Sequence, residues 1–201
     1  MRIEKLLRPA GLIVVAAGLI FQIVEPHRPR AVPLVVAAAA VVLGLVSLAP
    51  RRGRCLVIVR WVMAVLLALD FAGAVADRFG VLGEPGAAGV TWGDWDHFVD
   101  YTEQLLPWAP HPLAVAAALG ATAVESVLSV WLLSGWRRRA AGVVAAGLLS
   151  VFLASMLPTV GAVKVAMNAV PLLVGGALLL AAQPVDSDPG YCAGRSSHTV
   201  A

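Results

Sequence analysis

The chain has 201 residues, of which 60% are hydrophobic and only 13% are charged, and its mean hydropathy is +0.86. Soluble domains carry roughly 45–50% apolar and about 25% charged residues. This composition therefore excludes a soluble globule, a disordered chain and a fibrous protein, and it is typical of an integral membrane protein with one compact membrane domain.

The charge pattern and the motif content narrow the function classes. The net charge of +3 comes from short basic clusters at the ends of apolar runs, which is typical of the cytoplasmic side of a membrane protein and not of nucleic-acid binding. Cys55 and Cys192 form no CxxC motif, and the four histidines lie outside or at the edge of the apolar runs. The sequence also lacks Walker A, HExxH and nucleophile-elbow patterns. We expect no catalytic residues, no metal site, no covalently bound cofactor and no nucleic-acid partner.

The apolar runs predict the fold. Six runs approach the roughly 20 residues that a spanning helix needs, namely 9–24, 31–49, 55–76, 112–134, 140–157 and 165–182. The sequence thus predicts an all-α integral membrane protein with six transmembrane helices. Glu25-Pro26-His27-Arg28 follows the first run in place of a small-x-small cleavage site, so we interpret this run as a retained helix and not as a signal peptide.

Small residues and proline predict details of the helix packing. Gly142 and Ala146 form a small-xxx-small pair, which favours close contact between transmembrane backbones. Pro171, followed by Gly175 and Gly176, is expected to bend the last helix.

Basic residues predict the orientation of the chain. With the N-terminus inside, the inner segments hold ten Lys and Arg residues and the outer segments hold four, while Arg60 lies within the membrane. This bias predicts that both termini, and with them both cysteines, lie in the cytoplasm. We divide the chain into an N-terminal helical pair with its inner loop (1–54), a core (55–183) that includes an outer loop (77–111), and a disordered cytoplasmic tail (184–201).

The outer loop contains an amphipathic pattern. Thr91-Trp92-Gly93-Asp94 resembles a capping box, and it predicts a helix from Thr91 to Leu106. Its apolar side faces lipid or the bundle and consists of Trp95, Phe98, Val99 and Leu106. Asp96 and Asp100 on the other side have the spacing of a weak cation site, but a solvated polar face is the more common arrangement.

Five polar residues in or near the predicted spans are the candidate site: Arg60, Asp70, Glu125, Lys164 and Asn168. Ionisable groups in a bilayer need a partner or a purpose. They either form a polar pocket for a headgroup, a quinone or a proton, or they hold the helices in register. At 1.5 Å per residue, Arg60 and Glu125 differ in depth by roughly 6 Å. We therefore expect Glu125 to face the interior and to pair with Arg60 or hydrogen-bond to a neighbouring helix, unless Arg60 extends to the surface.

Two stretches carry a family resemblance. HFVDYTEQLLPW at 97–108 and AVESVLSVWLLSGWRRRAAG at 123–142 resemble the DoxX family of small bacterial membrane proteins. Glu125, Leu132, Leu133, Gly135 and Arg137–Arg139 match the family's glutamate, Leu-Leu-x-Gly and basic turn, whereas Ser129 stands where the family often has glycine. The resemblance spans about residues 56–182. It implies a four-helix core to which the first two predicted helices are an addition.

The resemblance also implies a function. DoxX-like proteins are associated with membrane redox systems, through quinone-linked oxidation or a partner oxidoreductase. We expect a non-catalytic accessory or subunit of such an assembly in the bacterial cytoplasmic membrane, with lipids and an oxidoreductase subunit as partners. The alternatives are a carrier or binding protein for a lipid, a quinone or another small hydrophobic molecule, and a quinone-dependent enzyme subunit.

Overall fold

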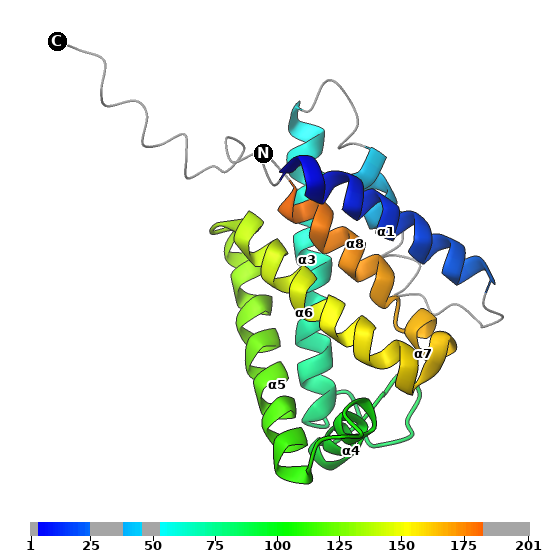
Figure 1. Cartoon of the computed structure of the whole chain (residues 1–201). Coiled ribbons are helices and arrows are strands. Elements are labelled where there is room, and N and C mark those ends of the chain that lie inside the picture. The colour runs from blue at the N-terminus through cyan, green and yellow to red at the C-terminus, as the bar shows by residue number, and fades with distance from the viewer. Residues whose placement is uncertain (1–3, 25–37, 46–52, 183–201) are drawn as a thin grey trace.

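The computed structural model describes residues 4–24, 38–45 and 53–182, and their regular structure is entirely helical (Figure 1). Residues 38–45 are a short helical segment. The helices with defined ends are α1 (Glu4–Val24), α3 (Gly53–Arg78), α4 (Trp95–Leu105), α5 (His111–Ser134), α6 (Arg138–Thr159), α7 (Gly161–Met167) and α8 (Val170–Ala181). The predicted all-α class is confirmed for these residues.

The described residues confirm only part of the predicted set of membrane spans. Three described helices are long and apolar enough to cross a membrane: α3 from Val57 onward, α5 and α6. The bent pair α7 and α8 would make a fourth span, while the apolar part of α1, Leu6–Ile20, is shorter. Six spans are therefore not confirmed. Most of the predicted run 31–49, and the whole tail 184–201, lie outside the described residues.

Helix α8 lies at the centre of the packing, between α1 and α6 and against α3 (Figure 1). Nearly every residue of α8 is buried. The helix is apolar around its whole circumference, which is the pattern of a helix enclosed on all sides. The core of the described bundle is therefore built around α8.

Small residues allow the backbones around α8 to approach closely. A Cβ atom added at Gly142 of α6 would lie 2.9 Å from the backbone nitrogen of Ala181 and 3.1 Å from the carbonyl oxygen of Ala177. On the other side of α8, a Cβ at Gly175 would lie 2.9 Å from the backbone nitrogen of Val15 in α1. The predicted Gly142 contact is present, and it joins α6 to α8.

The bend in the last apolar run lies earlier than predicted. Helices α7 and α8 meet at an angle of 54°, and the break falls at Asn168 and Ala169, where Ala169 has a left-handed φ of 52°. Pro171 lies in the first turn of α8, where a missing N–H breaks no helical hydrogen bond. Gly175 and Gly176 continue the helix, and Gly176 provides room for Met63 of α3.

Gly142→Ala is expected to lower the free energy of unfolding by about 1–3 kcal/mol, the usual cost of overpacking, because the backbone of α8 cannot move aside. Gly147→Ala is the matched control on the same helix, since a Cβ there meets nothing within 4 Å. It should be neutral or slightly stabilising. Unfolding of both variants in mixed micelles, followed by circular dichroism, checks this. Equal stability of the two variants would contradict the close α6–α8 contact.

Candidate functional site

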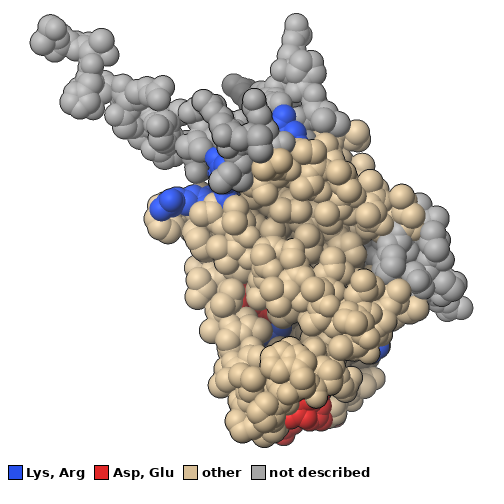
Figure 2. Space-filling model, viewed as in Figure 1, with Lys and Arg blue, Asp and Glu red and all other residues tan. Residues whose placement is uncertain are grey.

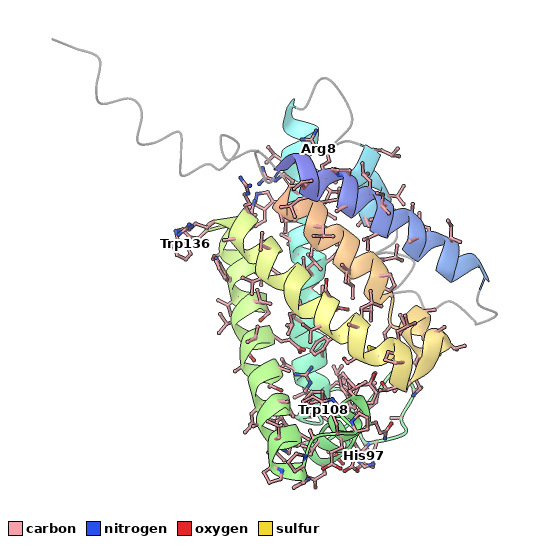
Figure 3. The ribbon with its side chains drawn as sticks, in the orientation of Figure 1. Arg8, His97, Trp108 and Trp136 are labelled. Atoms are coloured by element: carbon pink, nitrogen blue, oxygen red, sulfur yellow. The ribbon has the colours of Figure 1, made fainter. Side chains whose placement is uncertain are left out.

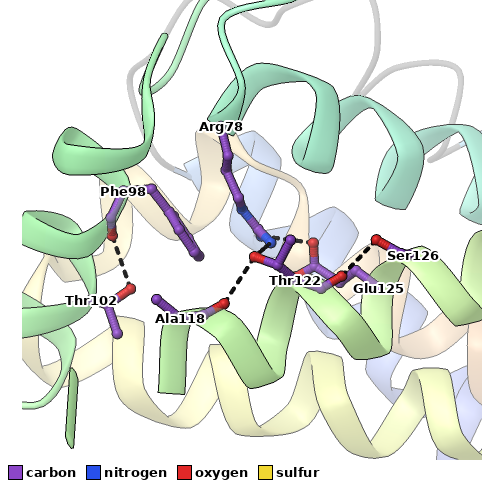
Figure 4. Close-up of polar contacts among 7 residues, drawn as sticks. All are labelled: Arg78, Phe98, Thr102, Ala118, Thr122, Glu125 and Ser126. Atoms are coloured by element: carbon purple, nitrogen blue, oxygen red, sulfur yellow. Dashed lines mark hydrogen bonds and ion pairs between the residues drawn. The ribbon is translucent and has the colours of Figure 1, made fainter. Parts of the chain in front are cut away.

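A buried ion pair joins α3 to α5 (Figure 4). Nη2 of Arg78 lies 2.6 Å from Oε2 of Glu125, and the two side chains are 2% and 1% exposed. Nη1 of Arg78 donates a hydrogen bond to Oγ1 of Thr122 at 2.8 Å, and this hydroxyl donates to the carbonyl oxygen of Ala118 at 2.8 Å. A charge this far from water is tolerated when it is paired and hydrogen-bonded. The ion pair and the Thr122 bond meet this need for Nη1 and Nη2 of Arg78, whereas its Nε has no hydrogen-bond partner among the described residues.

Aromatic rings from the outer loop cover the guanidinium of Arg78. Its carbon Cζ lies 3.8 Å from the ring centre of Phe98 in α4 and 5.2 Å from that of Trp92. The ring of Trp92 in turn packs edge-on against Phe98, with 5.0 Å between the ring centres. Cation–π attraction strengthens when the cation is desolvated. The guanidinium is thus enclosed between polar groups of α5 and the aromatic rings of the loop and α4.

Asp77 holds the loop that carries Trp92. Its buried carboxylate oxygen Oδ2 accepts the backbone N–H groups of Thr91 and Trp92, at 2.9 and 3.1 Å. Gly93 follows with a left-handed φ of 79°, and a Cβ there would collide with the backbone of Pro85. Successive residues of α3, Asp77 and Arg78, therefore fix the loop backbone and the aromatic rings over the end of the helix. We call this unit of loop 79–94 and α4 the outer cap.

Helix α4 begins four residues later than the predicted Thr91. Asp94 is the N-cap, and its Oδ1 accepts the backbone N–H of His97 at 2.8 Å, so the cap is an aspartate and not the predicted threonine capping box. Phe98 and Val99 are buried as predicted, and they pack on Ala118 of α5. Trp95 and Leu106 are only partly buried. The apolar face of α4 thus rests on the bundle.

The partner of Glu125 differs from the prediction. Glu125 is buried against a neighbouring helix, but its cation is Arg78 and not Arg60. The depth estimate assumed that the predicted helices ended level with one another at the outer surface. Instead, the first turns of α5 lie beside α4, beyond the end of α3, so the middle of α5 meets the last residue of α3.

Of the other four predicted residues, Arg60, Lys164 and Asn168 lie apart from this pair, and Asp70 lies nearer to it. Arg60 is buried on α3, 18 residues before Arg78 and thus about 27 Å away along the helix. Asp70, partly exposed on α3, is near enough to Glu125 to experience its charge. Lys164 is exposed on α7, and Nδ2 of Asn168 donates to the Lys164 carbonyl oxygen at 3.0 Å.

Arg78, Thr122 and Asp77 are the site residues that sequence reasoning missed. Arg78 was assigned to the outer loop because the predicted helix stopped at 76, whereas α3 continues to Arg78. A signal was present in the sequence. Met63, Leu67 and Phe71 form the buried face of α3, and Arg78, seven residues after Phe71, continues that face.

Comparison with known proteins found no match: no family model, no curated protein and no solved structure matches the chain. The resemblance to the DoxX family stays a prediction.

Glu125→Gln is expected to lower the free energy of unfolding by on the order of 3–5 kcal/mol, the usual cost of removing one partner of a buried ion pair. Adding Arg78→Met should recover part of this loss, because the buried cation is then removed as well. The control is Glu125→Gln combined with Arg60→Met, which should show no such recovery. A double-mutant cycle measured by unfolding in mixed micelles gives both coupling energies. Equal coupling to Arg60 and Arg78 would contradict the assigned pair.

The stability of the exposed start of α4 depends on pH. Nδ1 of His97 lies 2.8 Å from Oδ1 of Asp94, and this hydrogen bond raises the pKa of His97 above 6.5. The His97 backbone N–H lowers the pKa of Asp94 below 3.8. The stabilising contribution of His97 is therefore lost as pH rises through its folded-state pKa, and that of Asp94 is lost as pH falls through its own. Both are present between pH 3.8 and 6.5.

Asp94→Asn should bring the pKa of His97 back toward 6.5, because asparagine keeps the cap acceptor but removes the charge. Asp100→Asn is the control, since Asp100 raises the His97 pKa less than Asp94 does. A nitrogen-15 NMR titration of the histidine rings in micelles measures both. A His97 pKa that is unchanged in Asp94→Asn would exclude Asp94 as the main cause.

Proposed function

We propose that the chain is a DoxX-like membrane protein that acts as a non-catalytic accessory or subunit of a membrane-associated redox assembly. The observation that carries the accessory role is the Arg78–Glu125 pair with its aromatic cover. Both charged groups are enclosed by protein and bonded to protein, so they hold the outer cap in place rather than meet a substrate. The redox assignment rests on the DoxX resemblance alone.

A cap held in this way offers a fixed surface to a partner. Its exposed side carries acidic residues, among them Asp96 and Asp100 on α4, and Figure 2 shows acidic side chains gathered at this end of the molecule. Phe79 and Trp108 expose large apolar side chains at 61% and 74%. Aromatic residues are enriched at protein interfaces, and this combination favours docking of another subunit.

We also propose that the protein lies in the bacterial cytoplasmic membrane with six spans and with both termini in the cytoplasm. The ten-to-four bias in Lys and Arg supports this orientation. The basic turn Arg137–Arg139 and the outer cap lie at opposite ends of α5, before α6 and after α3 respectively, which agrees with placing them on opposite sides of a membrane.

One observation favours the carrier alternative. A groove of about 140 Å³ lies between α1 and residues 38–45, and its lining is apolar. Leu12, Val15 and Leu19 line one side, and Val41, Gly44 and Leu45 line the other. Such a groove accepts a segment of an acyl or isoprenoid chain. The predicted pair of Arg60 and Glu125, which could have formed part of a polar pocket for a headgroup, is not formed, because Glu125 pairs with Arg78.

Purification in mild detergent followed by mass spectrometry separates the two functions. The accessory role predicts an oxidoreductase subunit at fixed stoichiometry, lost in the cap variant Asp96→Asn/Asp100→Asn and kept in the groove variant Gly44→Leu. The carrier role predicts a co-purifying lipid or quinone that is lost in Gly44→Leu and kept in the cap variant. A pure protein with neither a partner nor a bound molecule would contradict both proposals.

A further inference from the structure

The end of the bundle opposite the outer cap is rich in arginine. Gly142 of α6 packs on Ala181, and Gly11 of α1 packs on Leu179, near the C-terminal end of α8. Arg138 precedes Gly142 by about one turn, and Arg8 precedes Gly11 by three residues. The arginines of two helices thus flank the end of a third. Figure 3 places Arg8 and Trp136 at this end and His97 and Trp108 at the other.

In the described parts of the chain, basic residues outnumber acidic residues at this end. The C-terminal end of α8 contributes only about half a negative charge, against Arg8 and the three arginines Arg137–Arg139. In the described parts of the chain, every Asp and Glu other than Glu4 lies between Asp70 and Glu125. Figure 2 shows a basic cluster at this end and an acidic cluster at the other. Arg8, Arg138 and Arg139 make contacts within the protein, but a guanidinium has five N–H donors and can also bind an anion.

The turn between α5 and α6 is fixed by tryptophan contacts. The guanidinium of Arg138 stacks on Trp61 of α3, 3.1 Å from the ring centre. Gly135 has a left-handed φ of 75°, and a Cβ there would lie 2.8 Å from Nη2 of Arg138. Nε1 of Trp131 donates to the carbonyl oxygen of Trp136 at 2.8 Å. These contacts hold the turn in one conformation.

The held turn presents an indole and a guanidinium side by side at the surface. Trp136 is 65% exposed, and Cζ of the exposed Arg137 lies 5.8 Å from its ring centre. Arg137 has a φ of 43°, a left-handed conformation that a residue with a side chain adopts at a cost. Leu133 and Val143 expose apolar side chains on the adjacent turns of α5 and α6, so apolar surface borders the arginines.

We propose that this basic turn, Trp136 to Arg139, binds the phosphate headgroup of an anionic phospholipid. Arg137 and Arg139 contact the phosphate oxygens, since a guanidinium matches phosphate with two parallel hydrogen bonds. Arg138, stacked on Trp61, adds a fixed positive charge. Trp136 lies at the level of the headgroups, where indoles are enriched, and the acyl chains lie along Leu133 and Val143. The adjoining apolar surface favours a lipid over a soluble phosphate.

The test uses the purified full chain in neutral detergent, with phosphatidylglycerol or phosphatidylcholine added. Phosphatidylglycerol should raise the thermal unfolding midpoint and stay bound in native mass spectrometry, whereas phosphatidylcholine should do neither. Arg137→Gln/Arg139→Gln should weaken phosphatidylglycerol binding by about tenfold for each charge-assisted contact that is lost. Lys164→Gln, an exposed basic residue outside this turn, is the control and should bind normally.

Equal stabilisation by the two lipids, or unchanged phosphatidylglycerol binding in the glutamine double variant, would overturn the proposal. So would a loss of binding in Lys164→Gln as large as that in the double variant. Full stabilisation by glycerol phosphate would also overturn it, because the turn would then bind a soluble anion. Arg137→Lys/Arg139→Lys keeps the charge and should bind with intermediate affinity. If the glutamine variant does not fold, the affinity of this lysine variant for phosphatidylglycerol and the salt dependence of binding test the proposal instead. An affinity of the lysine variant equal to that of the wild type would exclude the bidentate contact. No partner subunit is used, so the result is independent of the proposed function.

Discussion

The constraint on which the rest depends is that the guanidinium of Arg78 has no access to water. At the end of α3 it needs a counter-charge and hydrogen-bond acceptors from protein, and Glu125 and Thr122 on α5 supply them. These contacts set the register of α3 against α5. The same cation attracts the rings of Phe98 and Trp92, so it also decides where α4 rests. One buried charge thereby couples two long helices to a short surface helix.

The inward face of α3 links the two ends of the molecule. Arg60, Met63, Leu67 and Phe71 share this face with Arg78, and the apolar members pack in the core around α8. Trp61, next to Arg60, carries the stacked guanidinium of Arg138 at the basic end. A single helix therefore supports the aromatic cover at one end and the basic turn at the other, and between them the close α8 contacts leave little freedom for the ends to move relative to each other.

The sequence predicted the parts that depend on local pattern. The runs at 112–134 and 140–157 agree closely with α5 and α6, and the apolar face of α4 includes the predicted Phe98 and Val99. The sequence did not predict features that depend on how far one helix is shifted along its neighbour, or on the backbone conformation of a single residue. The partner of Glu125 depends on α5 extending past the end of α3 beside α4, and the bend before α8 depends on a left-handed Ala169. Neither the offset nor the φ of an alanine is visible in hydropathy.

The role of the Arg78–Glu125 pair in the fold is explained better by its geometry than by its contribution to stability. Well-packed apolar residues often replace a buried ion pair without loss of stability, and an apolar pair at 78 and 125 would suit a hydrocarbon-rich bundle. An apolar pair, however, would be indifferent to small shifts of α5 along α3. The forked guanidinium accepts only the arrangement in which Nη1 meets Thr122 and Nη2 meets Glu125. That same arrangement leaves the flat face of the guanidinium for Phe98, so the position of the outer cap follows from the directionality of one side chain.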